Sequence, residues 1–266
     1  MSSQRLSASP VSPVDESPIL SALAWSSPLR RYGYQVVAHD GGPASFLALK
    51  VAFAEVIADR LERFAGVAVG RLVLEDYAAR VEELEIDHGA FVRATTRRLP
   101  DHLLRCAHMT RLVELAGLAV GQRLRVYNDV LEYRACRPHA PDSNPWHRDS
   151  WFPGFKPLMN VYLPLSGSWI DSSLQVVPGS HVWTNEECIP SFQFTERHYQ
   201  AGTTEKEGVR FNVPEVAECR HELRGHRPDI VPGDFMVFPT SCVHGNASNA
   251  SPETRFSFEF RLEVVP

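Results

Sequence analysis

The sequence predicts one α+β domain in which helices from the first half of the chain cover one side of a sheet or barrel built from the second half. Two observations lead to this prediction. Apolar residues recur at three- and four-residue spacing up to Gly121, and they alternate with polar residues after it. The chain of 266 residues, 44% of them hydrophobic, is long enough for one large core, which is a better expectation than two small ones.

The first half is expected to begin with a short strand over 32–40, which ends at the break formed by Gly41, Gly42 and Pro43. A helix over 44–64 follows, and further helices are expected at 74–85, 88–98 and 100–118, the last of them ended by Gly121. One apolar stripe marks the first helix: Phe46, Leu47, Val51, Phe53, Ala54, Ile57, Leu61 and Phe64. Such a stripe is typical of a face buried in a core.

Short strands rich in Val, Tyr, Phe and Leu are expected in the second half, at 124–133, 158–165, 174–177, 235–239 and 255–264. The last strand has one polar and one apolar face. Its polar residues are Arg255, Ser257, Glu259 and Arg261, and its apolar residues are Phe256, Phe258, Phe260 and Leu262. The polar face either meets solvent or lines a wet barrel interior that holds a polar ligand, and alternation alone favours neither.

Two segments are expected to lie outside this core. Residues 1–18 are rich in Ser and Pro and lack a hydrophobic run, so they are predicted to be a disordered tail, which leaves 19–266 as the domain. Residues 182–227 are too long for a simple turn and carry several aromatic side chains. We interpret them as a lid or substrate loop inserted in the domain; the alternatives are an ordered ornament and a partly disordered segment.

Charge and cysteine content exclude several classes of protein. A net charge of -5 without basic blocks gives no footprint for nucleic acid or for a membrane surface. The five cysteines are widely spaced and form no C-x-x-C, so we expect reduced thiols and a cytoplasmic protein. There is no G-x-S-x-G elbow, no G-x-G-x-x-G and no Walker sequence, which argues against a serine hydrolase and a nucleotide fold. The oligomeric state is not predicted.

The most informative stretch runs from Asn144 to Phe152 and reads Asn-Pro-Trp-His-Arg-Asp-Ser-Trp-Phe. On an extended strand, His147 and Asp149 point to the same side and can reach one metal ion. His244, which follows a predicted strand, offers a third ligand. Two histidines and one carboxylate form the facial triad of non-haem Fe(II) oxygenases. The other histidines are interpreted as structural in the case of His181 and otherwise as surface or capping residues: His39, His88, His102, His108, His139, His198, His221 and His226.

Four ordered motifs resemble those of the phytanoyl-CoA dioxygenase family. They are Pro-Trp-His-Arg-Asp-Ser-Trp at 145–151, Leu-Gln-Val-Val-Pro-Gly-Ser-His at 174–181, Pro-Gly-Asp-Phe-Met-Val-Phe at 232–238, and His244 followed by Arg255 in Thr-Arg-Phe-Ser-Phe. The resemblance covers roughly residues 100–264 and implies a double-stranded β-helix, the cupin-like jelly-roll, as the core under the N-terminal helices. It also implies an enzyme that uses Fe(II), 2-oxoglutarate and O2.

The resemblance implies roles for individual residues. His147, Asp149 and His244 are expected to bind iron, and Arg255 is expected to hold the distal carboxylate of 2-oxoglutarate, which suits the planar guanidinium. The resemblance also implies a cosubstrate contact at Asn246. The residues alone suggest further contacts: Gln175 and Asn160 to the cosubstrate and Tyr162 to the substrate, if their strands alternate, and Trp151 and Phe152 as an apolar wall near the iron. A polar group satisfied inside the core, or packing under the barrel, explains these five residues equally well.

The expected reaction is hydroxylation of an unactivated C–H bond in a small-molecule metabolite of amino-acid or secondary-metabolite type, with release of succinate and CO2. Asp149 favours this outcome, because relatives that halogenate replace the carboxylate with a small residue. Desaturation and ring closure remain open. The alternatives from other classes are a jelly-roll hydrolase or isomerase that uses Zn(II) or Mn(II), and a ligand-binding module without catalysis.

Overall fold

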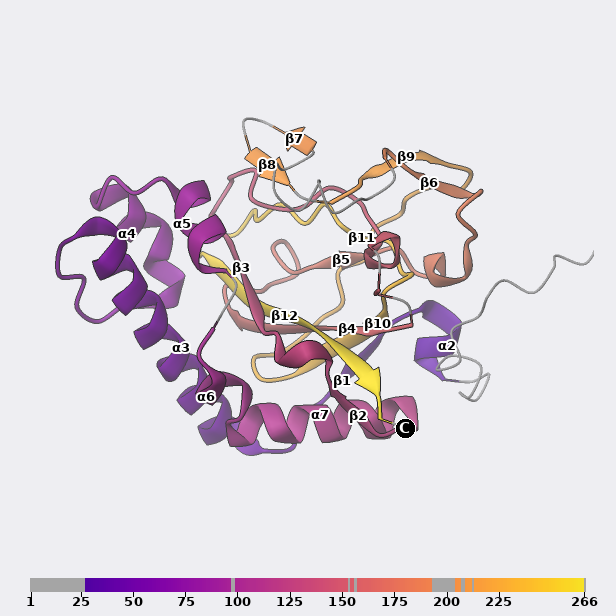
Figure 1. The fold of residues 1–266 in the computed structure, drawn as a ribbon, viewed down its shortest axis with the longest axis horizontal. Coiled ribbons are helices and arrows are strands. Elements are labelled where there is room, and N and C mark those ends of the chain that lie inside the picture. Colours follow the sequence, from indigo (N-terminus) through magenta and orange to yellow (C-terminus); the bar gives the residue numbers. More distant parts are fainter. Residues whose placement is uncertain are drawn as a thin grey trace, which may run out of the picture.

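The computed structural model describes residues 27–96, 99–152, 154–155, 157–192, 204–206, 209–211 and 213–265. The predicted tail at 1–18 lies outside the described residues. A six-stranded antiparallel sheet has helices over one face and a two-stranded sheet toward the other (Figure 1). The strands of the large sheet follow the order β1, β10, β4, β12 and β2, with β3 also paired to β12. Helices and an antiparallel sheet occur in the two halves where the sequence places them.

The helices come before residue 121, as predicted. They are α2 (Pro28–Tyr32), α3 (Gly42–Ala65), α4 (Tyr77–Glu83), α5 (His88–Thr95), α6 (Asp101–Leu104) and α7 (Ala107–Val120), with short 3-10 turns η1 (Leu74–Asp76), η2 (Tyr127–Asp129), η3 (Asp149–Trp151) and η4 (Ser180–Val182). The structure departs from the prediction in several places. The sequence does not suggest α2, the helix expected over 74–85 starts as η1, and the one expected over 100–118 is two helices. The helix expected over 44–64 begins at Gly42, the one expected over 88–98 ends at Thr95, and the strand expected over 32–40 is limited to 35–37.

The strands of the large sheet are β1 (Gln35–Val37), β2 (Leu124–Val126), β3 (Glu132–Cys136), β4 (Met159–Ser166), β10 (Phe235–Pro239) and β12 (Arg255–Val264). Pairs of shorter strands form three small sheets: β5 (Gln175–Val176) with β11 (His244–Gly245), β6 (Cys188–Pro190) with β9 (Val216–Cys219), and β7 (Thr204–Lys206) with β8 (Val209–Phe211). The bounds of β10 and β12 are those predicted. The strand expected over 124–133 is two strands, because η2 interrupts it.

The long helix α3 holds the helical layer on the sheet. Its residues Leu49, Phe53, Ile57 and Leu61 recur at four-residue spacing and are buried, and α3 ends at Gly66 with a left-handed backbone (φ 72°). Phe53 meets the rings of Phe256 and Phe258 edge to face, with centroids 5.6 and 4.8 Å apart. The predicted stripe is wrong at Leu47, Val51 and Phe64, which are 59%, 46% and 45% exposed.

The structure decides which way the polar face of β12 points. Phe256, Phe258, Phe260 and Leu262 belong to the core between the helices and the sheet. Arg255 and Ser257 on the opposite face are 2% and 0% exposed, so this polar face points into the molecule. A second apolar cluster fills the space between the large sheet and the β5–β11 pair, with Tyr162, Val176, Met236 and Phe238 among its members. The interior reading of the polar face is therefore the correct one.

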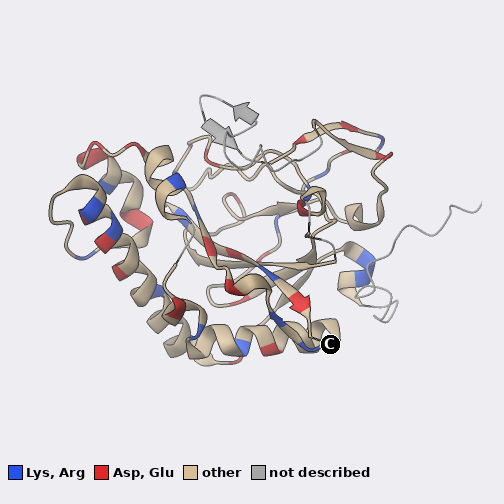
Figure 2. Ribbon diagram, viewed as in Figure 1, with Lys and Arg blue, Asp and Glu red and all other residues tan. Residues whose placement is uncertain are grey.

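Charged residues of both signs are interspersed along the helices (Figure 2). Among the described residues, no helix is at once long enough and apolar enough to cross a membrane. Two histidines that we expected at the surface are buried: His88 is 7% and His108 is 1% exposed. His88 lies between the Tyr77 hydroxyl and the Asp142 carboxylate, at 3.1 and 3.4 Å, which satisfies both ring nitrogens.

Candidate metal centre

A reciprocal pair of backbone hydrogen bonds brings the two candidate histidines together. The N–H of His147 donates to the carbonyl of His244 at 3.0 Å, and the N–H of His244 donates to the carbonyl of His147 at the same distance. Residues paired in this way across an antiparallel bridge carry their side chains on one side. The two imidazole centroids are accordingly 4.3 Å apart.

Gly245 allows the two segments this close approach. Its φ is +119°, and a Cβ at this position would lie 2.4 Å from the carbonyl oxygen of Pro145. A side chain would therefore push the two histidine segments apart. The Val-His-Gly motif thus combines one ligand with the backbone freedom that places it.

Asp149 completes the group from the same segment as His147. The backbone is extended at Arg148, and Asp149 begins the 3-10 turn η3, so His147 and Asp149 do not share a strand; His147 forms an isolated bridge with His244. The N–H of Ser150 fixes this turn by donating to the Thr240 carbonyl at 2.9 Å. One oxygen of Asp149, Oδ1, lies 3.5 Å from Nε2 of His147 and 3.8 Å from Nε2 of His244.

The hydrogen bonds of the two rings leave the correct nitrogen for a metal. Nδ1 of His147 donates to the Pro145 carbonyl at 2.8 Å, and Nδ1 of His244 donates to the Cys242 carbonyl at 3.0 Å. A carbonyl only accepts, so in each neutral ring Nδ1 carries the proton and Nε2 keeps its lone pair. Both Nε2 atoms face Asp149 Oδ1. Donors bound at about 2.1 Å in neighbouring positions lie about 3 Å apart, so a small contraction closes the three around one ion.

Protonation states also suit metal binding. Burial, followed by the neighbouring His147, lowers the pKa of His244 to about 4, so this ring is neutral at pH 7. Burial alone would raise the pKa of Asp149, but the charge of Arg261 opposes it and holds the pKa well below its usual range. Two imidazoles and one carboxylate on one side of a site are the donor set of non-haem Fe(II). The residues present fit that ion.

Arg255 lines the same pocket as His147 and His244. It enters from the start of β12, opposite Cys136 of β3, and is 2% exposed. Its Nη1 donates to the Ser172 carbonyl and its Nη2 to Cys136 Sγ at 2.8 Å. Nε is buried and has no hydrogen-bond partner among the described residues. A buried donor of this kind fits the carboxylate of 2-oxoglutarate.

The other predicted site residues lie at different depths. Asn160 is 4% exposed, and its Nδ2 also has no hydrogen-bond partner in the described part of the chain. Tyr162 is fully buried and its hydroxyl contacts Ser168 Oγ at 2.9 Å. Gln175 donates to the Asn246 carbonyl at 2.9 Å, and the Asn246 side chain is exposed. None of these four residues is among those that line the pocket with Arg255.

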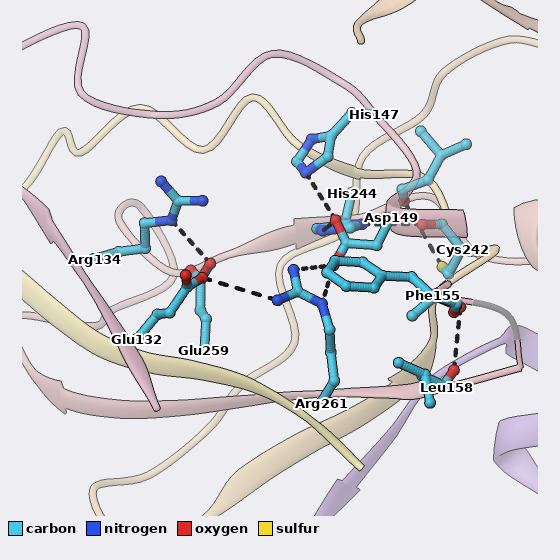
Figure 3. A network of polar contacts seen from close by, with 12 residues as sticks. Glu132, Arg134, His147, Asp149, Phe155, Leu158, Cys242, His244, Glu259 and Arg261 are labelled. Carbon is cyan, nitrogen blue, oxygen red and sulfur yellow. Dashed lines mark hydrogen bonds and ion pairs between the residues drawn. The ribbon is translucent and has the colours of Figure 1, made fainter. Parts of the chain in front are cut away.

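The two aromatic residues predicted near the iron, Trp151 and Phe152, have different surroundings. Trp151 is half-buried, and its Nε1 donates to Asn185 Oδ1 at 3.2 Å. Phe152 packs with Phe155, whose ring lies under the guanidinium of Arg261 at 4.3 Å. Phe152 is thus the one of the two that is joined, through Phe155, to side chains around Asp149. Figure 3 shows Phe155 beside Arg261.

Sequence reasoning missed a group of charged residues beside Asp149. Arg261 pairs with the Asp149 carboxylate, and Arg134 donates to Glu259 at 3.1 Å (Figure 3). Glu132 lies 3.8 Å from Arg261. The alternation of β12 marked Glu259 and Arg261 as members of one polar face, and that signal would have found them once the face was known to point inward. Nothing local marks Glu132 or Arg134, since they join the group only through β3–β12 pairing.

Comparisons with known proteins identify the family of this chain. The family model described as phytanoyl-CoA dioxygenase (PhyH) matches residues 29–257. No curated protein sequence matches the chain. Solved structures of similar fold include EctD from S. alaskensis with 2-oxoglutarate and 5-hydroxyectoine, at 17% identity and a TM-score of 0.55, which covers 96% of this chain and 82% of that one.

AviO1 from Streptomyces viridochromogenes Tue57 is 17% identical with a TM-score of 0.52, covering 96% of this chain and 99% of that one. The epimerase SnoN, in complex with Fe3+, alpha ketoglutarate and nogalamycin RO, is 18% identical with a TM-score of 0.52, covering 89% and 81%. At these identities the structures show a shared fold, and the family follows from the match of the model over most of the chain. The chain belongs to the phytanoyl-CoA dioxygenase family.

Proposed function

We propose that this protein is an Fe(II)- and 2-oxoglutarate-dependent oxygenase that hydroxylates an unactivated C–H bond of a small-molecule metabolite and releases succinate and CO2. One observation carries the proposal. His147 and His244, which with Asp149 form the donor set, line one pocket with the buried guanidinium of Arg255. A metal site of another chemistry has no need for such a cation beside it.

The chain's own residues would divide the work in the following way. His147, Asp149 and His244 hold iron, which supplies the activation of O2 when it is bound. Arg255 orients 2-oxoglutarate by taking its distal carboxylate. Asn160, whose buried amide has no hydrogen-bond partner among the described residues, is proposed as a second donor to the cosubstrate. Phe152 and Phe155 form an apolar wall that excludes water from the reacting side.

Other parts of the proposal rest on the fold. The apolar cluster between the large sheet and the β5–β11 pair supports a double-stranded β-helix as the core, covered by α3 and α7 on the outer face. The segment 182–227 contributes the β6–β9 pair, and Cys188 of that pair is in the same buried cluster as Val243. We propose that this segment is the lid over the substrate. Gln175, Asn246, Trp151 and Tyr162 stay as proposed contacts, and a cytoplasmic location as a proposal.

The substrate is proposed to be an amino acid or a secondary metabolite. SnoN is described as an epimerase and SnoK, another structure of similar fold, as a carbocyclase, so the products must be identified and not only the consumption of 2-oxoglutarate. A metabolite screen with anaerobically loaded Fe(II) protein, started by adding O2, tests the proposal. Hydroxylation requires one succinate for each product that has gained one oxygen atom. A product that has gained none would contradict hydroxylation, and no succinate from any mixture would contradict the oxygenase assignment.

A further inference from the structure

The two oxygens of the Asp149 carboxylate face different partners. Oδ1 faces the Nε2 atoms of His147 and His244. Oδ2 accepts from Arg261 twice, from Nη2 at 2.6 Å and from Nε at 3.1 Å (Figure 3). The carboxylate is therefore divided between the metal-binding side and a two-point contact with a guanidinium.

Arg261 is itself held in place on its remaining sides. It projects from β12 on the same face as Arg255 and is 19% exposed. Its Nη1 lies 3.8 Å from Glu132, and Phe155 stacks against the guanidinium with its ring centroid 4.3 Å from Cζ. An arginine fixed by a strand, an acid and an aromatic ring has little freedom to leave Asp149, so the contact is built into the fold.

We propose that Arg261 is a positioning residue that keeps Asp149 as a one-oxygen ligand, by occupying Oδ2 and leaving Oδ1 for the metal. This inference rests on the proposed function. A carboxylate that binds with both oxygens takes one more coordination position, and an oxygenase of this kind must keep positions open for its cosubstrates. The two N–H groups of one guanidinium converge on Oδ2 and occupy its acceptor sites, which leaves Oδ1 for the metal; an ammonium group has no such fixed pair of donors.

A purely structural role for Arg261 makes a different prediction. Buried ion pairs often contribute little net stability, but breaking one leaves a charge without its partner. If stability were the whole role, removal of the guanidinium would change unfolding and leave metal coordination as it was. Metal coordination is therefore the property to measure.

The test uses the full chain treated with chelator and then titrated with Co(II), whose visible absorption reports both affinity and coordination number. Arg261→Gln should bind Co(II) about 10- to 100-fold more weakly, which is the usual effect of losing a partner of a metal ligand, and its spectrum should change. Arg261→Lys, which keeps the charge but loses the two-point contact, should recover affinity in part and keep the altered spectrum. Glu263→Gln is the control, because Glu263 lies on β12 like Arg261 and the substitution breaks its exposed ion pair with Arg125 of β2.

Thermal unfolding of the metal-free variants distinguishes a loss of folding from a change in metal coordination. If Arg261→Gln does not fold, the Co(II) titration of Arg261→Lys decides the question. Unchanged or tighter Co(II) binding with the parent spectrum in a folded variant overturns the proposal. A parent that binds Co(II) but shows no spectral response to 2-oxoglutarate contradicts the proposed function instead, and the comparison of Arg261 variants still stands.

Discussion

Among the described residues, two guanidinium groups line the pocket with both histidines, those of Arg255 and Arg134. Arg134 is paired with Glu259, so replacing Arg255 with Ala removes the group that is available to a carboxylate ligand. A lost charge-assisted hydrogen bond costs about 1.5 to 3 kcal/mol. That range corresponds to about a 10- to 150-fold loss of 2-oxoglutarate affinity. Arg255 is 2% exposed, so water cannot replace it easily and the upper part of the range is expected.

The assay is anaerobic titration of the Fe(II) protein with 2-oxoglutarate, followed by the visible charge-transfer band. Fe(II) affinity without cosubstrate should be nearly unchanged. Arg227→Gln is a matched control, because Arg227 donates to nearby loop carbonyls, those of Ser173 and Ser248, and does not line the pocket. Arg255→Lys separates charge from geometry, since it keeps the cation and loses the fork.

Folding must be checked in parallel, because Arg255 also donates to the Ser172 carbonyl and its removal leaves that acceptor buried. A variant that unfolds at the parent temperature and binds 2-oxoglutarate as tightly as the parent would refute the reasoning. The clamp would then be another cation, and the site face of β12 would have to be reassigned.

Three further predictions follow from particular contacts. Asp149→Gly should retain some Fe(II) with 2-oxoglutarate but lose hydroxylation by orders of magnitude, and azide should alter the charge-transfer band; full activity would exclude Asp149 as a ligand. Phe53→Ala should lower the free energy of unfolding, measured by urea titration, by about 3 to 5 kcal/mol, because Phe53 is 0% exposed and packs against the β12 phenylalanines. A loss below about 1 kcal/mol, roughly the effect of burying one methylene group, would contradict this packing. Burial lowers the pKa of His88 to about 4, so the free energy of unfolding should fall as the pH drops from 6.5 towards 4, by about 2 kcal/mol at pH 5 for this group. His88→Gln should lose that part of the pH dependence. An unchanged slope of unfolding free energy against pH in this variant would contradict the prediction.

The sign of the His88 effect follows from proton binding. The unfolded imidazole takes up a proton near pH 6.5, while the folded one stays neutral down to about 4. Between these values the unfolded state binds more protons, so acid favours unfolding. Above pH 7 neither state is protonated and His88 contributes no pH dependence.

Long elements with strong periodicity could be predicted from the sequence. The helix α3 and the strand β12 have residues whose own pattern decides their structure, and β12 begins and ends where its alternation does. The predicted helix over 100–118 fails at Arg105 and Cys106, where the chain leaves the helical conformation although the apolar spacing continues on both sides. Periodicity records which residues share a face and does not record such a break.

The strands β5 and β11 show a different limit. Each is two residues long and is defined by pairing with the other, so no local pattern could reveal β11. The grouping of the three candidate metal ligands could still be predicted, because His147 and Asp149 are two residues apart and the family motif supplies His244. Arg261 could not be connected with Asp149, since their contact depends on the path of η3 and on the register of β12 against β4. Alternation separates two faces of a strand, but only tertiary packing determines which face is buried.

The central claim is that His147, Asp149, His244 and Arg255 form one site for Fe(II) and 2-oxoglutarate. Anaerobic addition of Fe(II) and then 2-oxoglutarate to the parent protein and to His147→Ala and His244→Ala tests it most directly. The account predicts a saturable charge-transfer band in the parent and none in either variant, with all three proteins folded by circular dichroism. A parent without the band, or a folded His147→Ala or His244→Ala variant that keeps it at the same Fe(II) affinity, would contradict the account.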